Sequence, residues 1–138
     1  MKFFLDTNVL FDLYEIERVS HQDSFELVKA GLMGRLELVV TAASVMTMVY
    51  SLQRYKLSRE LIIGRLNKIL PHMEVAQISA TELLAGVNSG WPDLEDAIQF
   101  HAALTAGGID AIVSNDKDFK QQDRIPVLTP AQALRRLK

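Results

Sequence analysis

The sequence contains no cysteine, which excludes disulfide bonds and thiol chemistry. A bound metal ion would therefore depend on oxygen ligands or on the three histidines. His21, His72 and His101 show no ligand spacing among them, and we expect all three to be structural or exposed. Carboxylates are thus the best candidates for functional residues.

Long apolar runs and glycine-rich loops are also missing. The chain begins with Met1 and Lys2 and reaches a polar turn within a few residues, so we predict neither a signal peptide nor a membrane span, and we expect a cytoplasmic location. No glycine-rich phosphate loop follows a candidate strand, which disfavours a nucleotide-binding enzyme. The formal net charge of −2 is not that of a strongly basic nucleic-acid binder, although a metal-loaded acidic site can still meet phosphates.

What is present indicates one globular domain that spans residues 1–138. Short apolar runs predict strands, and the segments between them have helical spacing. Strands that alternate with helices predict an α/β fold, a three-layer sandwich whose central sheet is mostly parallel and has helices on both faces. The predicted strands are 3–5, 36–40, 73–76, 111–113 and 126–128.

The predicted helices have clear start signals. Ser79 followed by Glu82 is a capping box, Asp93 caps the next helix, and Thr129 caps a terminal helix with proline at its first position. A further helix begins at His21, and we expect Phe25 on its buried side.

Acidic residues follow two of the predicted strands. Asp6 comes directly after the first strand, and Asp116 and Asp118 come after strand 111–113. If the two strands are neighbours in a parallel sheet, these acids converge beyond their carboxyl ends. Thr7 and Asn8 follow Asp6 and could bind a ligand there, although the triplet Asp6 to Asn8 could equally cap the next helix.

A third acidic cluster opens the helix that begins at Leu94. Asp93 is expected to act first as a helix cap. Glu95 and Asp96 are adjacent and point about 100° apart on a helix, so we favour Asp96, which borders the buried side. Converging carboxylates repel one another unless a cation neutralises them, and hard oxygen ligands suit Mg²⁺ or Mn²⁺. Such ions usually serve phosphoryl transfer or phosphodiester hydrolysis.

Three segments resemble, in order and spacing, the acidic motifs of the PIN domain family. They are Leu5–Leu10 (LDTNVL), Asp93–Ala97 (DLEDA) and Ser114–Phe119 (SNDKDF), and the resemblance covers essentially the whole chain. It implies a metal-dependent endoribonuclease that hydrolyses RNA phosphodiesters, often the toxin of a toxin–antitoxin pair and often a homodimer.

The resemblance also implies roles for individual residues. Asp6, Asp96 and Asp116 would hold Mg²⁺ or Mn²⁺, which activates a water molecule to attack RNA. Asp116 is the better ligand and Asp118 a secondary one. The other secondary positions, which include those that would orient phosphate or water, are Thr7, Asn8, Asp93, Glu95, Ser114 and Asn115.

One position departs from the family pattern. Thr47 stands where the family usually has a glutamate, early in the helix after the second strand. A neutral hydroxyl is a weak ligand, so the site would lose one charge, for which Glu95 or Asp118 could compensate. The alternative function is therefore a PIN-like module that binds nucleic acid or protein with weakened catalysis.

The segment from Thr41 to Leu70 carries more apolar residues than one buried helix face needs, Met46, Met48 and Tyr50 among them. These residues indicate either a dimer contact or ordinary core. An antitoxin, where one exists, would be a separate chain.

Overall fold

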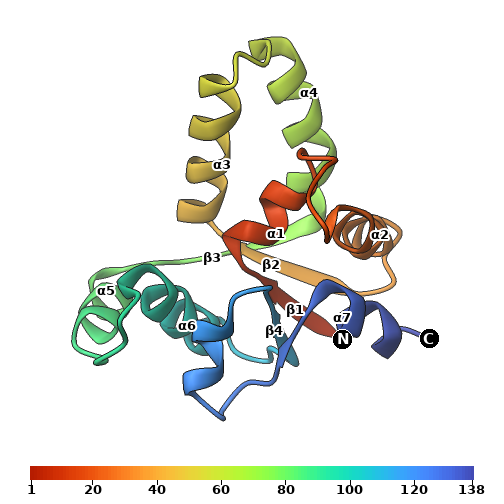
Figure 1. The fold of residues 1–138 in the computed structure, drawn as a ribbon. Coiled ribbons are helices and arrows are strands. Elements are labelled where there is room, and N and C mark those ends of the chain that lie inside the picture. Colours follow the sequence, from red (N-terminus) through yellow and green to blue (C-terminus); the bar gives the residue numbers. More distant parts are fainter.

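The computed structural model describes residues 1–138 and shows a five-stranded, all-parallel sheet with helices on both faces (Figure 1). The predicted three-layer α/β fold is confirmed. The elements in chain order are β1 (Lys2–Leu5), α1 (Thr7–Asp12), α2 (His21–Leu32), β2 (Glu37–Thr41), α3 (Ala42–Arg54), α4 (Arg59–Ile69), η1 (Leu70–His72), β3 (Met73–Ala76), α5 (Ala80–Val87), α6 (Leu94–Ala106), β4 (Ala111–Val113), η2 (Lys117–Gln121), β5 (Val127–Leu128) and α7 (Pro130–Arg136).

The strand order β3-β2-β1-β4-β5 places β1 at the centre of the sheet. The chain moves outward from β1 to β3 and then returns to the other side of β1, so the strand order reverses between β1 and β4. In open parallel sheets such a switch point leaves a crevice beyond the carboxyl ends of the strands. Leu5 pairs with Val113 at that end, and the amide of Asp6 donates a hydrogen bond to the Val113 carbonyl over 3.0 Å.

Successive side chains of the buried strands point to opposite faces of the sheet. Phe3 and Leu5 belong to a core that includes residues of α1, α2, α3 and α4. Phe4 belongs to a second core with Phe100 of α6 and Phe119 of η2. Both sheet faces are therefore covered, which explains why β1 is an uninterrupted apolar run.

Polar side chains begin the helices as predicted. The Ser79 and Glu82 capping box is present at α5, and Asp93 accepts the amide of Asp96 at the start of α6. Thr129 caps α7. These caps fix the residues at which α5, α6 and α7 begin.

The prediction for Phe25 is wrong, because this side chain is 47% exposed. Leu27 and Val28 bury the sheet-facing side of α2, whereas Phe25 lies on the adjoining face beside His21, with ring centroids 6.2 Å apart. The spacing of the apolar residues identifies the helix, but it does not show how much of the apolar face of α2 the sheet buries.

Helices α3 and α4 form an antiparallel pair that projects from the body of the molecule (Figure 1). In α3, Met48 and Leu52 are buried, whereas Met46 is 71% exposed and Tyr50 is 60% exposed. The apolar residues of this segment are thus divided between core and surface. No helix in the structure is both long enough and apolar enough to cross a membrane.

Candidate metal centre

Asp6 lies at the carboxyl end of β1 and is only 3% exposed. One carboxylate oxygen, Oδ1, accepts the Thr7 amide over 2.7 Å, which makes Asp6 the cap of α1. The other, Oδ2, accepts hydrogen bonds from Asn8 Nδ2 over 2.6 Å and from Ser114 Oγ over 2.7 Å. The two interpretations of the first motif are therefore compatible, because the residue that caps the helix also faces the end of β4.

Burial raises the pKa of Asp6 from its ordinary value of 3.8 to about 6. The hydrogen bonds from Ser114 and Thr7 oppose this rise, and the negative charges of Glu95 and Asp116 add to it. Acids from α6 and from the segment after β4 are therefore close enough to Asp6 to influence its titration.

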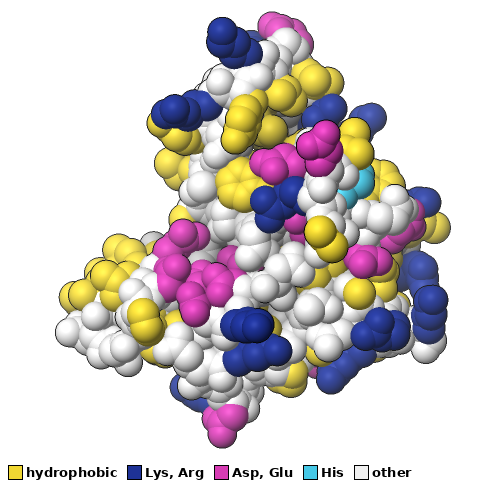
Figure 2. All heavy atoms as spheres, in the orientation of Figure 1, with side chains coloured by type: hydrophobic (Ala, Val, Ile, Leu, Met, Phe, Trp, Pro, Cys, Tyr) yellow, Lys and Arg dark blue, Asp and Glu magenta, His cyan; other side chains and the backbone are white.

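The acids that meet most closely are Asp93, Asp96, Asp116 and Asp118. One carboxylate oxygen from each lies within 4.8 Å of those of the other three. Figure 2 shows acidic side chains gathered in a hollow between the projecting α3–α4 pair and the body of the molecule. Asp6 is not one of these four, although its charge acts on Asp96. The structure thus brings together two of the three predicted principal acids, Asp96 and Asp116, and places Asp6 beside them.

Asp96 is the acid whose environment most requires a positive partner. The side chain is 5% exposed, and its Oδ2 atom is buried without a hydrogen-bond partner. Burial and the neighbouring charges of Asp6, Asp93 and Asp116 raise the pKa of Asp96 from 3.8 to about 8. A buried carboxylate oxygen without a partner costs stability, and a hard divalent cation would relieve both the missing contact and the repulsion. The donor set therefore fits Mg²⁺ or Mn²⁺.

Local hydrogen bonds hold the acids of the β4 segment in place. Ser114 Oγ accepts the amide of Asp116 over 2.9 Å, and Asp116 Oδ1 accepts the amide of Asp118 over 2.9 Å at the start of η2. Burial and the charge of Asp116 raise the pKa of Asp118. Ser114 contacts both Asp6 and Asp116, so it links the two strand ends.

Three of the secondary residues, Thr7, Asn8 and Ser114, donate hydrogen bonds to Asp6, as described above. The sequence favours Asp96 over Glu95 at the crevice and keeps Glu95 as a secondary residue. In the structure Glu95 is exposed, and its Oε1 accepts a hydrogen bond from Thr7 Oγ1 over 3.3 Å. Its long side chain reaches back over the helix start, which the angle between adjacent helix positions does not reveal.

Asn115 faces away from the acids and belongs to a polar network that the sequence analysis missed. At the centre of this network is Asp12, which is 1% exposed and accepts hydrogen bonds from Arg18 Nε over 2.6 Å, Ser24 Oγ over 2.7 Å and Asn115 Nδ2 over 3.3 Å. Ser20 Oγ donates to Asn115 Oδ1 over 3.1 Å. The network ties the α1–α2 connection to the segment that carries Asp116. A carboxylate between Phe11 and Leu13 was the available sequence signal.

A second missed network lies on the α3 side of the site. Ser44 is 1% exposed, and its Oγ is 2.6 Å from Thr7 Oγ1 and accepts a hydrogen bond from Gln99 Nε2 over 2.8 Å. Thr47 is exposed and lies one turn further along α3. The groups that α3 presents near Thr7 are therefore neutral.

The fold and the site together define a class: an α/β domain whose carboxylates converge at the switch point of a parallel sheet. A family model described as PIN domain matches residues 2–118, and the chain belongs to the PIN domain family. It is 30% identical over 132 residues to Ribonuclease VapC1 of Aquifex aeolicus (strain VF5), an alignment that covers 93% of this chain and 90% of the relative.

A solved structure supports the fold assignment. The chain resembles one in the crystal structure of VapBC2 from Rickettsia felis bound to a DNA fragment from their promoter. The TM-score is 0.63 with 16% sequence identity, over 94% of this chain and 98% of that chain. At this identity the similarity concerns the fold.

Proposed function

We propose that this protein is a Mg²⁺- or Mn²⁺-dependent endoribonuclease and the toxin of a toxin–antitoxin pair. The observation that carries the proposal is the group of four carboxylates within 4.8 Å of one another, with the buried Oδ2 of Asp96 left without a partner. The similarity to a protein named a ribonuclease supports RNA as the substrate.

In this proposal Asp6, Asp96 and Asp116 are the catalytic acids and metal ligands, and Asp93 and Asp118 complete the group. A divalent cation held there would lower the pKa of a bound water molecule and stabilise charge on the phosphate. Thr7, Asn8 and Ser114 fix the position of the Asp6 carboxylate by donating to it.

Asn8 offers a further function within the site. Its Oδ1 atom is buried without a hydrogen-bond partner, while its Nδ2 donates to Asp6. A free acceptor beside the acids is suited to orient an attacking water molecule, because a water molecule in this position must be held by a hydrogen bond that it donates.

The second candidate function is a PIN-like module that binds nucleic acid or protein with weakened catalysis. Its supporting observation is the neutral α3 side of the site, where Ser44 contacts Thr7 and Thr47 is exposed. The two functions differ in whether bound metal supports RNA cleavage.

We also propose an antitoxin partner, a homodimer and a cytoplasmic location. Exposed apolar residues beside the site are suited to protein contacts, since Met46 is 71% and Leu83 is 46% exposed, and both line an apolar groove that reaches Glu95. Light scattering of the purified chain, alone and with a co-expressed antitoxin, would test both assemblies. A strictly monomeric chain would contradict the dimer.

The experiment that tests the enzyme is calorimetric titration of Mn²⁺ into the metal-free protein, followed by an RNA cleavage assay at saturating metal. Asp96→Asn and Asp116→Asn are expected to lose Mn²⁺ binding and cleavage. Asp123→Asn is the matched control, because Asp123 is exposed and lies outside the acidic group. Binding without cleavage would favour the binding module, and unchanged binding in both site variants would refute the metal centre.

A further inference from the structure

Helices α3 and α4, residues 42–69, form a projecting arm whose base lies at the acidic site. Ser44 at the start of α3 contacts Thr7, next to Asp6. The whole of α3 spans 13 residues, which at 1.5 Å per residue is about 20 Å. The arm therefore extends from the site to a tip where α3 meets α4 (Figure 1).

The arm differs in charge from the rest of the chain. It contains five cations and one carboxylate, a net charge of +4, while the whole chain has −2, so the other residues carry −6. None of the five cations forms an ion pair with a carboxylate in the structure. The cations are Arg54, Lys56, Arg59, Arg65 and Lys68, and the carboxylate is Glu60.

Two tyrosines stand among the cations near the tip. Tyr50 is 60% exposed and Tyr55 is 73% exposed. The Arg54 guanidinium lies over the Tyr50 ring at 5.7 Å from its centroid and donates to the tyrosine hydroxyl over 3.0 Å. Exposed aromatic rings between unpaired cations are the surface on which single-stranded nucleic acids stack their bases and place their phosphates.

The backbone at the tip adds an independent observation. Lys56 has φ of 59°, and it is the only non-glycine residue with positive φ in the protein. Glycine adopts this conformation without strain, whereas lysine does not. A lysine side chain thus occupies an exposed turn where glycine would fit better, which indicates a use for its charge.

We propose that the arm is a binding surface for single-stranded RNA, which runs from the acidic site along α3 to the tip. Tyr55 stacks on a base, and Lys56, with Arg54 and Arg59, contacts phosphates. The charge of the arm is complementary to RNA, while the acidic remainder of the chain would repel it. This inference rests on the proposed ribonuclease function and adds the path of the substrate.

The test measures RNA binding by fluorescence anisotropy, using a fluorescein-labelled, unstructured 20-nucleotide RNA in EDTA, where metal-dependent cleavage is absent. Lys56→Gly is the decisive variant, because it should raise or preserve the Tm while weakening RNA binding. Each lost phosphate contact should reduce the slope of log K against log salt by about 0.7. Tyr55→Ala should weaken binding at least about fivefold, and Tyr55→Phe should restore it.

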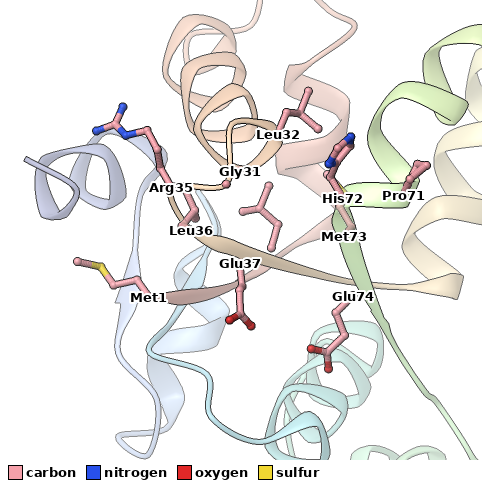
Figure 3. Close-up of a pocket in the computed structure, with 12 residues that line it drawn as sticks. Met1, Gly31, Leu32, Arg35, Leu36, Glu37, Pro71, His72, Met73 and Glu74 are labelled. Carbon is pink, nitrogen blue, oxygen red and sulfur yellow. The ribbon is translucent and has the colours of Figure 1, made fainter.

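Arg35→Gln is the matched control for charge. Arg35 is exposed and lines a pocket at the amino ends of β2 and β3 (Figure 3). The acids lie at the other end of the sheet, beyond the carboxyl ends of the strands. This variant should bind RNA as the wild type does. If Arg35→Gln weakens binding as much as Lys56→Gly, the attraction is a general effect of charge and the proposal is wrong.

Cleavage by the wild type with Mn²⁺ separates this inference from the proposed function. A wild type that cleaves RNA, with arm variants that bind and cleave equally well, would overturn the arm proposal alone and leave the arm as a surface for an acidic protein partner. A wild type that binds RNA through the arm but never cleaves it would support the arm and refute the enzyme.

Discussion

Asp6→Asn is expected to stabilise the metal-free protein at pH 8. Burial raises the pKa of Asp6 from 3.8 to about 6, which is a difference of about two pH units. At 1.36 kcal/mol per unit, ionised Asp6 lowers the free energy of unfolding by about 3 kcal/mol above pH 6. Asparagine is neutral at every pH and removes this contribution.

Lost hydrogen bonding reduces the gain. The Thr7 amide can still donate to the side-chain oxygen of the introduced asparagine, but the new NH₂ group would face Asn8 Nδ2 and Ser114 Oγ, which both donate to Asp6. Asn8 can turn its amide over, because its Oδ1 has no partner. One weakened hydrogen bond costs about 1 kcal/mol, so the net gain at pH 8 is about 2 kcal/mol.

The sign of the effect depends on pH. Between pH 4 and 6 folded Asp6 holds a proton that the unfolded chain has released, so the stability of the wild type falls as the pH rises through this range. Below pH 4 both states are protonated, and only the hydrogen-bond loss of the variant remains. Asp6→Asn should therefore be less stable than the wild type at pH 4 and more stable at pH 8.

Urea denaturation in EDTA at both pH values measures this difference, with Asp123→Asn as the exposed control. A variant that is destabilised by the same amount at pH 4 and at pH 8 would show that Asp6 is not strained by its charge. It would also remove the main electrostatic argument for a cation beside it.

Three further predictions concern the site and its support. Thr47→Glu should tighten Mn²⁺ binding in calorimetry by adding a carboxylate on α3, and an unchanged Kd would exclude that face of the helix from the site. Asp12→Ala should lower the free energy of unfolding by about 2 kcal/mol in urea, because it leaves the buried Ser24 hydroxyl without its acceptor and leaves Arg18 with only Glu15 and the Asn8 carbonyl; a loss below about 1 kcal/mol would contradict the network. Mn²⁺ binding at pH 7 should release about one proton, since the pKa of Asp96 is about 8, and a binding enthalpy that is the same in buffers of different ionisation enthalpy would refute this.

The fold was predictable because local signals agree with the global arrangement. Apolar runs too short for helices identify the strands, and polar caps such as Ser79 and Asp93 mark where the helices begin. Even the two-residue strand β5 follows this rule, since Pro126 precedes it and Thr129 ends it. The acids converge for the same reason, because the neighbouring parallel strands β1 and β4 have their carboxyl ends side by side.

The detailed grouping of the acids was not predictable in the same way. The sequence motifs favour Asp6, Asp96 and Asp116 as the principal acids, whereas the closest group in the structure contains Asp93 and Asp118 instead of Asp6. The difference arises because Asp93 is the cap of α6 and Asp118 lies in the short helix η2, where side-chain direction depends on local hydrogen bonds such as the one from the Asp118 amide to Asp116. Strand and helix periodicity carries no information about such positions.

No ion pair within the protein involves the acids of the site. The four ion pairs of the structure involve neither Asp6 nor the four acids grouped beside it. The guanidinium of Arg18 forms ion pairs with Asp12 and Glu15 instead. The donors that reach Asp6 from Thr7, Asn8 and Ser114 are all neutral. Neutral donors orient a carboxylate but leave its charge in place, so protons or a bound cation would relieve the repulsion. Protons relieve the repulsion at low pH, as the raised pKa values of Asp6 and Asp96 indicate, and a divalent cation bound at pH 8 would relieve it in the same way.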